Sequence, residues 1–365
     1  MATAARDSRP RRLYIDWARG LAVLVMIEAH TSDAWTRPAD RATFAFHDAT
    51  MLGGFAAPLF LWLAGVALVF SAGSWARRCG NRAAAVNAVC RRGLEIFILA
   101  FLFRIQAFIV SPGSHPITLF RVDILNIMGP AITVAGLVWG LFTTTAMLAG
   151  AYAGLASAFA MLTPVVRTWT LVGSLPTWVQ WYVRPAGEHT TFTAFPWAGF
   201  VFAGAFVGVL LAAARDRNAE RRLHIALMLA GLLLVAVGFY TASLPSIYQQ
   251  SSFWTSSPTY FAIRVGVMMI ALSTLYALGL AAERRGFTLA WLQRLGRSSL
   301  FVYWIHVELV YGYATWPLRF RLPLWGTSVA CAIFTVAMYA AVIAKDRAGR
   351  SWRQRTLQVK VIEVI

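Results

Sequence analysis

Four ionisable residues interrupt the first long apolar segment of the chain, namely Asp16, Arg19, Glu28 and His30. Arg19 and His30 are eleven residues apart, which on a helix places them on one face, about 16 Å from each other. Glu28 and Asp33 flank His30, and a neighbouring carboxylate can set the tautomer and basicity that an imidazole needs as a general base. The structural alternative is an i,i+3 pair of Asp16 with Arg19 and a His30 that reaches water at the outer end.

A second candidate general base is His47, which lies beside Asp48 shortly before the next apolar segment. An imidazole titrates near neutral pH, as proton removal from an attacking group requires. A histidine in a connecting segment is, however, more often only solvated. Both histidines are kept as catalytic candidates, with Glu28 and Asp33 as their supporting carboxylates, and His30 is favoured.

Other ionisable side chains fall in or beside apolar segments, although a charge at the bilayer centre costs at least about 2.5 to 3.5 kcal/mol. These residues are Arg104, Asp123, Arg264, His306 and Glu308. Arg104 is expected to pair with Asp123, and the alternative for each of the others is a structural ion pair or hydrogen bond. Their number favours a bundle that encloses a polar cavity, so we predict that they and Arg19 bind substrate or cofactor.

The elements that position these residues are predicted to be about ten transmembrane helices, in an all-α polytopic bundle. Of the 365 residues, 59% are hydrophobic and 13% are charged, and the apolar residues form blocks long enough to cross a hydrocarbon core of about 30 Å. The predicted spans are Leu13–His30, Met51–Phe70, Leu94–Val110, Ile124–Leu141, Thr145–Leu162, Phe195–Ala214, Leu223–Ala242, Thr259–Ala281, Ser298–Trp316 and Pro323–Ala344.

The net charge of +18 is strongly one-sided. Of the 33 lysines and arginines, 23 fall in segments that we place in the cytoplasm and seven in segments that we place outside. The positive-inside rule explains this distribution, puts both termini in the cytoplasm and removes the need for a nucleic-acid partner. We expect a basic segment at 1–12, a single transmembrane domain at 13–344 and a basic tail at 345–365.

The remaining motifs indicate little about chemistry. The three cysteines show no disulfide framework, and no metal-ligand spacing is present, so no metal is expected. The outer loop after the fifth span is rich in aromatic residues, including Trp169, Trp178 and Trp181. These rings are typical of an interfacial belt. The alternative is that they form a surface on which the rings of a carbohydrate stack.

Several motifs resemble the transmembrane acyltransferase superfamily. An Arg and a His separated by ten residues, as in Arg19 and His30, recur on its first helix. The stretch at 53–65, GGFAAPLFLWLAG, is similar to the second-helix motif of the branch that contains heparan-α-glucosaminide N-acetyltransferase. The stretches at 195–204, FPWAGFVFAG, and at 295–306, LGRSSLFVYWIH, resemble later motifs of that branch.

The resemblance implies transfer of an acyl group, in the first place acetyl, from cytoplasmic acyl-CoA to an extracytoplasmic carbohydrate or glycan. No permanently bound cofactor is implied. In the heparan branch the position that matches His30 is similar to Asn, and the catalytic His precedes the second helix, nearest to His47. In the O-acyltransferase branch the residue matching His30 is the catalytic candidate.

The CoA phosphates are expected to meet arginines of the inner loops, at 77–92 or at Arg294 and Arg297. We expect the protein in the bilayer of a bacterial cytoplasmic membrane, and a homo-oligomer is possible. The competing interpretation is a multi-pass transporter or flippase, in which the same buried residues hold substrate or relay protons.

Overall fold

The computed structural model describes residues 12–111, 115–187, 190 and 192–362. Within these ranges every regular element is a helix, and the only β-structure is two isolated bridges. Eight described segments are long and apolar enough to cross a membrane. Their main helices are α3 (Ala56–Cys79), α4 (Arg82–Val110), α5 (Ile124–Leu141), α6 (Thr145–Thr168), α9 (Ala194–Ala213), α10 (Arg217–Ala242), α11 (Pro258–Arg285) and α14 (Leu324–Ile362).

The two other predicted spans correspond to α1 (Leu13–Trp35) and α13 (Ser299–Tyr311), which hold most of the ionisable residues discussed above. The 13 residues of α13 extend only about 20 Å. Each of the ten predicted spans thus corresponds to a helix, and the all-α polytopic class is confirmed. The shorter elements are η1 (Pro38–Asp40), α2 (Phe44–Gly53), η2 (Pro116–Phe120), α7 (Thr170–Gly173), α8 (Thr177–Val183), α12 (Ala290–Arg297) and η4 (Tyr313–Leu318).

Several helix boundaries differ from the predicted spans because turns and polar extensions are weak signals in a hydropathy pattern; α4, for example, begins at Arg82 and not at Leu94. The second span begins in α2, which breaks at Gly54, so that the long helix α3 starts only at Ala56. The ninth span ends as an α-helix at Tyr311 and continues as the 3₁₀ turn η4. The last helix does not stop at Ala344 but continues to Ile362, so the predicted tail is a helical extension of the span as far as that residue, and 363–365 lie outside the described residues.

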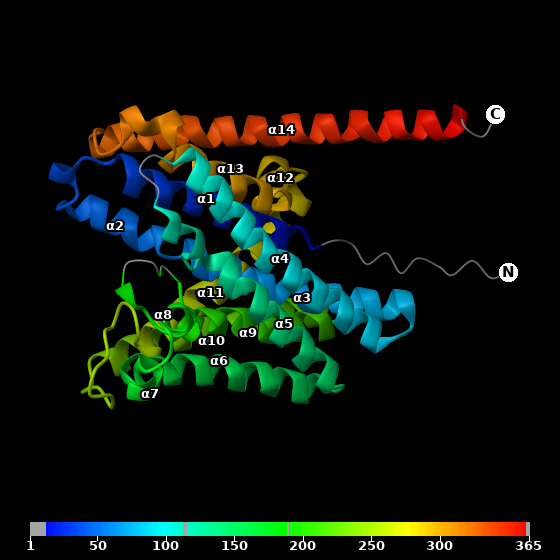
Figure 1. Ribbon diagram of the computed structural model, residues 1–365. Coiled ribbons are helices and arrows are strands. Elements are labelled where there is room, and N and C mark those ends of the chain that lie inside the picture. The colour runs from blue at the N-terminus through cyan, green and yellow to red at the C-terminus, as the bar shows by residue number, and fades with distance from the viewer. Residues whose placement is uncertain (1–11, 112–114, 188–189, 191, 363–365) are drawn as a thin grey trace.

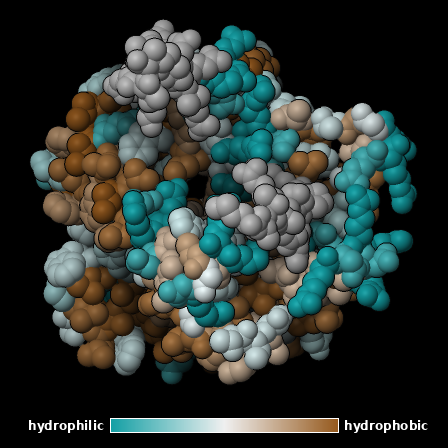
Figure 2. All heavy atoms as spheres, turned by 90° about the vertical axis from the view of Figure 1, so that its right-hand side faces the viewer, coloured by the Kyte–Doolittle hydropathy of each residue, from teal (hydrophilic) through white to brown (hydrophobic). Residues whose placement is uncertain are grey.

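The segments predicted to be cytoplasmic meet at one end of the bundle. Arg12 donates to Glu220 at 2.7 Å, and Arg294 lies 3.7 Å from Asp346, so ion pairs join the start of α1 to α10 and α12 to α14. Figure 1 shows the start of α1 and the end of α14 at this end, with α2, α7 and α8 at the other. Figure 2 views the same end, where hydrophilic side chains gather. This arrangement agrees with the topology expected from the arginine distribution.

Helices α3 and α9 pack closely in the core of the bundle. A Cβ atom at Gly204 would lie 1.8 Å from the Trp62 carbonyl oxygen, and one at Gly65 would lie 2.0 Å from the Val201 carbonyl oxygen. Small residues allow such backbone approach between membrane helices, where dispersion contacts replace the hydrophobic effect as the main attraction. The pair forms a rigid wall, with Trp62 and Phe200 fully buried.

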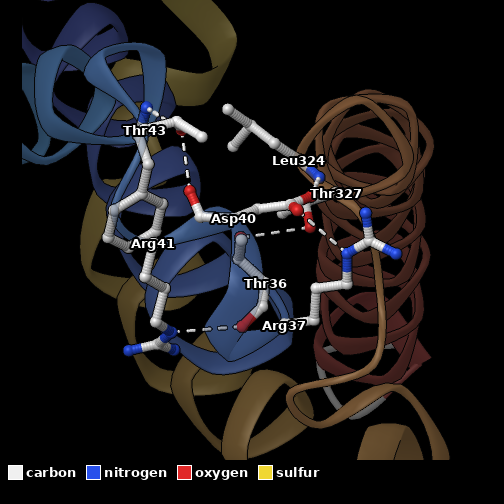
Figure 3. A network of polar contacts seen from close by, with 8 residues as sticks. Thr36, Arg37, Asp40, Arg41, Thr43, Leu324 and Thr327 are labelled. Carbon is white, nitrogen blue, oxygen red and sulfur yellow. Dashed lines mark hydrogen bonds and ion pairs between the residues drawn. The ribbon is translucent and has the colours of Figure 1, made fainter.

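A polar network at the opposite end ties the start of α14 to the segment after α1 (Figure 3). Asp40 accepts from the Leu324 amide at 2.8 Å and from Arg37 Nε at 2.9 Å, and the hydroxyls of Thr36 and Thr327 lie 3.2 Å apart. The Leu324 amide, and after it the Arg37 side chain, lower the pKa of the Asp40 carboxyl. The ionised carboxylate therefore holds the two segments together.

We predict that Gly204→Ala destabilises the protein by about 1 to 3 kcal/mol, because the added methyl group overpacks a helix contact that has no room. Gly154 lies on the exposed side of α6, and a methyl group added there would have no heavy atom within 4 Å. Gly154→Ala is the control and should be neutral or slightly stabilising. Thermal unfolding in detergent measures both, and equal stability of the two variants would contradict the packing account.

We also predict that Asp40→Ala lowers the unfolding temperature at neutral pH. Because the folded-state pKa lies below the ordinary value of 3.8, the stabilisation is complete above that value and is lost as pH falls through the folded-state pKa. The gap between wild type and variant should therefore close in acid. Asp48→Ala, at an exposed carboxylate of α2, is the control, and a gap that persists unchanged below pH 3.8 would refute the charge argument.

Candidate functional site

A cavity of about 990 Å³ lies among α1, α3, α4, α5, α11 and α13. Its lining extends from Ser71 and Arg92, in the halves of α3 and α4 nearest the basic end, to Thr118 and Arg121 at the opposite end. Arg92 and Arg121 are thus on opposite sides of the apolar part of α4. A cavity with this lining crosses most of the membrane-spanning region.

Seven of the predicted site residues line this cavity, which brings together side chains from five separate helices or their caps. The seven are Arg19, His30, Asp33, Arg104, Asp123, Arg264 and Glu308. His306 is fully buried directly behind His30. His47 is exposed on α2, where its ring meets Trp254 at a centroid distance of 6.4 Å, and it is not among the residues that line the cavity.

The hydrogen-bond partner of His30 is a histidine from another helix. His30 Nδ1 lies 2.8 Å from His306 Nε2, and His306 Nδ1 lies 2.8 Å from the Val302 carbonyl oxygen. Glu28 and Asp33, which the sequence placed beside His30, have other partners. Glu28 accepts from the Ser32 hydroxyl at 2.9 Å, and Asp33 accepts from the Tyr311 hydroxyl at 2.8 Å. The support of His30 therefore comes from α13.

The predicted pair of Arg104 and Asp123 is present as an ion pair in the cavity wall. Asp123 precedes α5 as its N-cap, and its backbone amide donates to the Asn126 side chain at 2.9 Å in a capping box. The Asn126 amide group in turn donates to Tyr182 at 3.3 Å. The carboxylate is thus held both by the helix terminus and by Arg104, a geometry that places the guanidinium toward the cavity.

Three charged side chains of the cavity wall, Arg104, Arg264 and Glu308, have polar atoms without a hydrogen-bond partner among the described residues; in Arg104 this atom is Nε. Glu308 is only 8% exposed, and neither of its carboxylate oxygens has a hydrogen-bond partner among the described residues. Arg264 donates to the Tyr260 hydroxyl at 3.1 Å, but its Nε has no partner in the same part of the chain. A buried polar atom without a partner costs about 1 to 3 kcal/mol, so a polar group brought next to these atoms would recover part of that cost.

Tyrosine and tryptophan side chains in the lining were not predicted from the sequence. Tyr303 and Tyr311 line the cavity from α13, and Trp197 from α9. The first two are eight residues apart, so they recur on one helix face with Val307 between them. That periodicity is visible in the sequence, but an apolar segment buried all round does not reveal which face adjoins a cavity.

The fold and the site together define a polytopic helical membrane protein with an internal cavity lined by paired and unpaired ionisable groups. A protein-family model described as an acyltransferase domain matches residues 12–344. The chain belongs to this family, and the protein is a membrane acyltransferase. A search of curated proteins found no match.

We predict that Arg104→Met destabilises the protein by about 3 to 5 kcal/mol, because Asp123 then stays buried without its counter-charge. The double variant Arg104→Met, Asp123→Asn should recover part of that loss, since asparagine retains the cap and removes the buried charge. Arg91→Met is the control on the same helix. Arg91 pairs with Glu95 at 3.2 Å but is 80% exposed, so its loss should change stability by less than about 1 kcal/mol.

Thermal unfolding in one detergent is measured for the wild type, for Arg104→Met, for Asp123→Asn and for the double variant, which together form a double-mutant cycle. Strictly additive losses from Arg104→Met and Asp123→Asn would show that the pair has no coupling energy.

Proposed function

We propose that the protein transfers an acyl group from cytoplasmic acyl-CoA to a hydroxyl or amine of an extracytoplasmic carbohydrate or glycan, with His30 as general base. The observation that carries this proposal is a cavity that runs between the two ends of the bundle and has His30 in its wall. A donor from one side and an acceptor from the other can meet at that histidine without crossing lipid.

The end of the cavity near the cytoplasm suits the donor. Arg92 and Arg19 line it there, together with Ser299, and guanidinium groups bind phosphate oxygens through charge-assisted hydrogen bonds. Arg19 donates to the Ser299 hydroxyl at 3.3 Å, which holds its side chain at this end. The pantetheine arm of the donor would then extend along the apolar walls, which include Phe60 and Leu63, toward His30.

The opposite end suits an acceptor that presents both donors and acceptors of hydrogen bonds. The two free oxygens of Glu308 accept from hydroxyl or ammonium groups, and the free Nε of Arg264 donates to oxygen. Trp197 lines the same cavity, and a flat ring packs well against a sugar face. These complementary features support a carbohydrate as the acceptor, as the resemblance to the heparan branch also implies.

The proposed step is a single acyl transfer at His30 Nε2. The acceptor hydroxyl or amine gives its proton to Nε2 as its oxygen or nitrogen attacks the thioester carbonyl carbon. The tetrahedral intermediate collapses with cleavage of the carbon–sulfur bond, and the departing sulfur takes the proton back from Nε2. The products are the acylated acceptor and free CoA, so His30 returns to its starting state.

We predict that His30→Ala lowers transfer by about 10² to 10⁴-fold, the usual contribution of a general base, whereas His47→Ala has a smaller effect. Membranes that contain the full chain are supplied with radiolabelled acetyl-CoA, and both CoA release and label in the glycan and lipid fractions are measured. His47→Ala also serves as a matched control for histidine removal, because its exposed ring lies on α2.

Each other outcome identifies a different error. A dead His47→Ala with a nearly normal His30→Ala would transfer the role of base to His47 and favour the heparan-type arrangement. If neither change affects a measured substrate translocation and no acyl group moves, the transporter hypothesis replaces the present one.

A further inference from the structure

The contact between His30 and His306 is unusual because both partners are histidines and one of them is fully buried. Their rings are inclined by only 13° and their centroids are 5.0 Å apart, while Nδ1 of one and Nε2 of the other approach to 2.8 Å. The rings therefore meet edge to edge and nearly in one plane. This is the direction in which an imidazole nitrogen donates or accepts a hydrogen bond.

The hydrogen bonds determine which nitrogen carries each proton. The Val302 carbonyl oxygen can only accept, so His306 Nδ1, 2.8 Å away, must be the protonated nitrogen. In the neutral ring Nε2 then has a lone pair, and it accepts from His30 Nδ1–H at 2.8 Å. Neutral His30 is consequently left with an unprotonated Nε2, which is the nitrogen that a general base needs.

We infer that His306 is a positioning residue for acyl transfer, which holds His30 in the Nδ1–H tautomer and stabilises the imidazolium formed during the reaction. This inference rests on the proposed role of His30 as the base. As the acceptor group loses its proton to His30 Nε2, the Nδ1–H bond to His306 strengthens, because a charged donor forms a stronger hydrogen bond. The proton on Nδ1 stays in place, and the one on Nε2 leaves with the departing sulfur.

A neutral partner suits this position better than a carboxylate would. His306 is 0% exposed, and an additional permanent charge there would carry a large desolvation cost.

The ionisable groups around the pair come from several elements, and any pH profile will reflect them all. They are Glu28 and Asp33 of α1, Arg104 of α4, Asp123 at the start of α5, Arg264 of α11, Tyr303, Glu308 and Tyr311 of α13, and Cys331 of α14.

Two variants separate positioning from packing. In His306→Gln the side-chain carbonyl can still accept from His30 Nδ1–H, whereas His306→Met has similar bulk but offers no comparable acceptor. We expect the glutamine variant to keep kcat within about tenfold of wild type. We expect the methionine variant to lose about 10² to 10⁴-fold, as when a base is left in the wrong tautomer. KM for acetyl-CoA should change little in both.

The pH dependence of kcat/KM is a second measurement, and it would not change if His306 had only a structural role. The protonated form of His30 is inactive as a base, so activity rises with pH through its pKa. Without the acceptor at residue 306 the imidazolium is less stable, and the acidic limb of kcat/KM should shift to lower pH in the methionine variant. Val310→Ala, at a buried position of the same helix, is the packing control and should leave the limb unchanged.

The assay is CoA release from acetyl-CoA by purified full-length protein in membrane vesicles that also contain the native glycan fraction. Rates are normalised to folded protein by size-exclusion chromatography. The inference is overturned if His306→Met keeps both the wild-type kcat and the wild-type acidic limb, or if both variants lose activity only in proportion to folded protein. In either case a dead His30→Ala would leave the proposed function intact. An active His30→Ala would overturn the proposed base, and the role of His306 with it.

Discussion

The desolvation cost of ionisable side chains constrains how this bundle is built. A charge that faces hydrocarbon costs at least about 2.5 to 3.5 kcal/mol, yet α1, α4, α11 and α13 all carry charged residues within or near their apolar parts. The bundle places several of these residues, including Arg19, Arg104 and Glu308, on an internal cavity. Exposed apolar side chains of α4, α10 and α14 form the outer surface instead.

The close packing of α3 against α9 helps to separate the polar cavity from the apolar outer surface. Because glycines allow these backbones to touch, the two helices form a dense wall, and the remaining helices can diverge around the cavity without loosening the bundle. The outer network around Asp40 has a related role at the other side of the molecule, where it fastens α14 to the segment that follows α1. The network thereby restrains the end of α1, the helix that carries His30.

The site differs from a common acid-base arrangement in how its histidine is supported. The pair of His30 and His306 adds no fixed charge to the interior, whereas the charges that are present include the ion pair of Arg104 and Asp123 and the unpaired carboxylate of Glu308. The neutral His306 and the unpaired Glu308 carboxylate can both lie beside one cavity because they are on different faces of α13. His306 points to α1, while Glu308, two residues later, lines the cavity.

The sequence by itself determined the class of this protein and most of its spans, because hydrophobicity in blocks and one-sided arginines are local properties that need no knowledge of packing. It also indicated the pair of Arg104 and Asp123, which are 19 residues apart, on α4 and at the start of the next long helix, α5. Only the tertiary structure brought His30 to His306, across 276 residues. It also decided that Glu28 and Asp33 turn to other partners and that His47 is exposed on α2. Such contacts depend on the rotation and neighbours of each helix, and a helix that is apolar on most faces does not encode these in its periodicity.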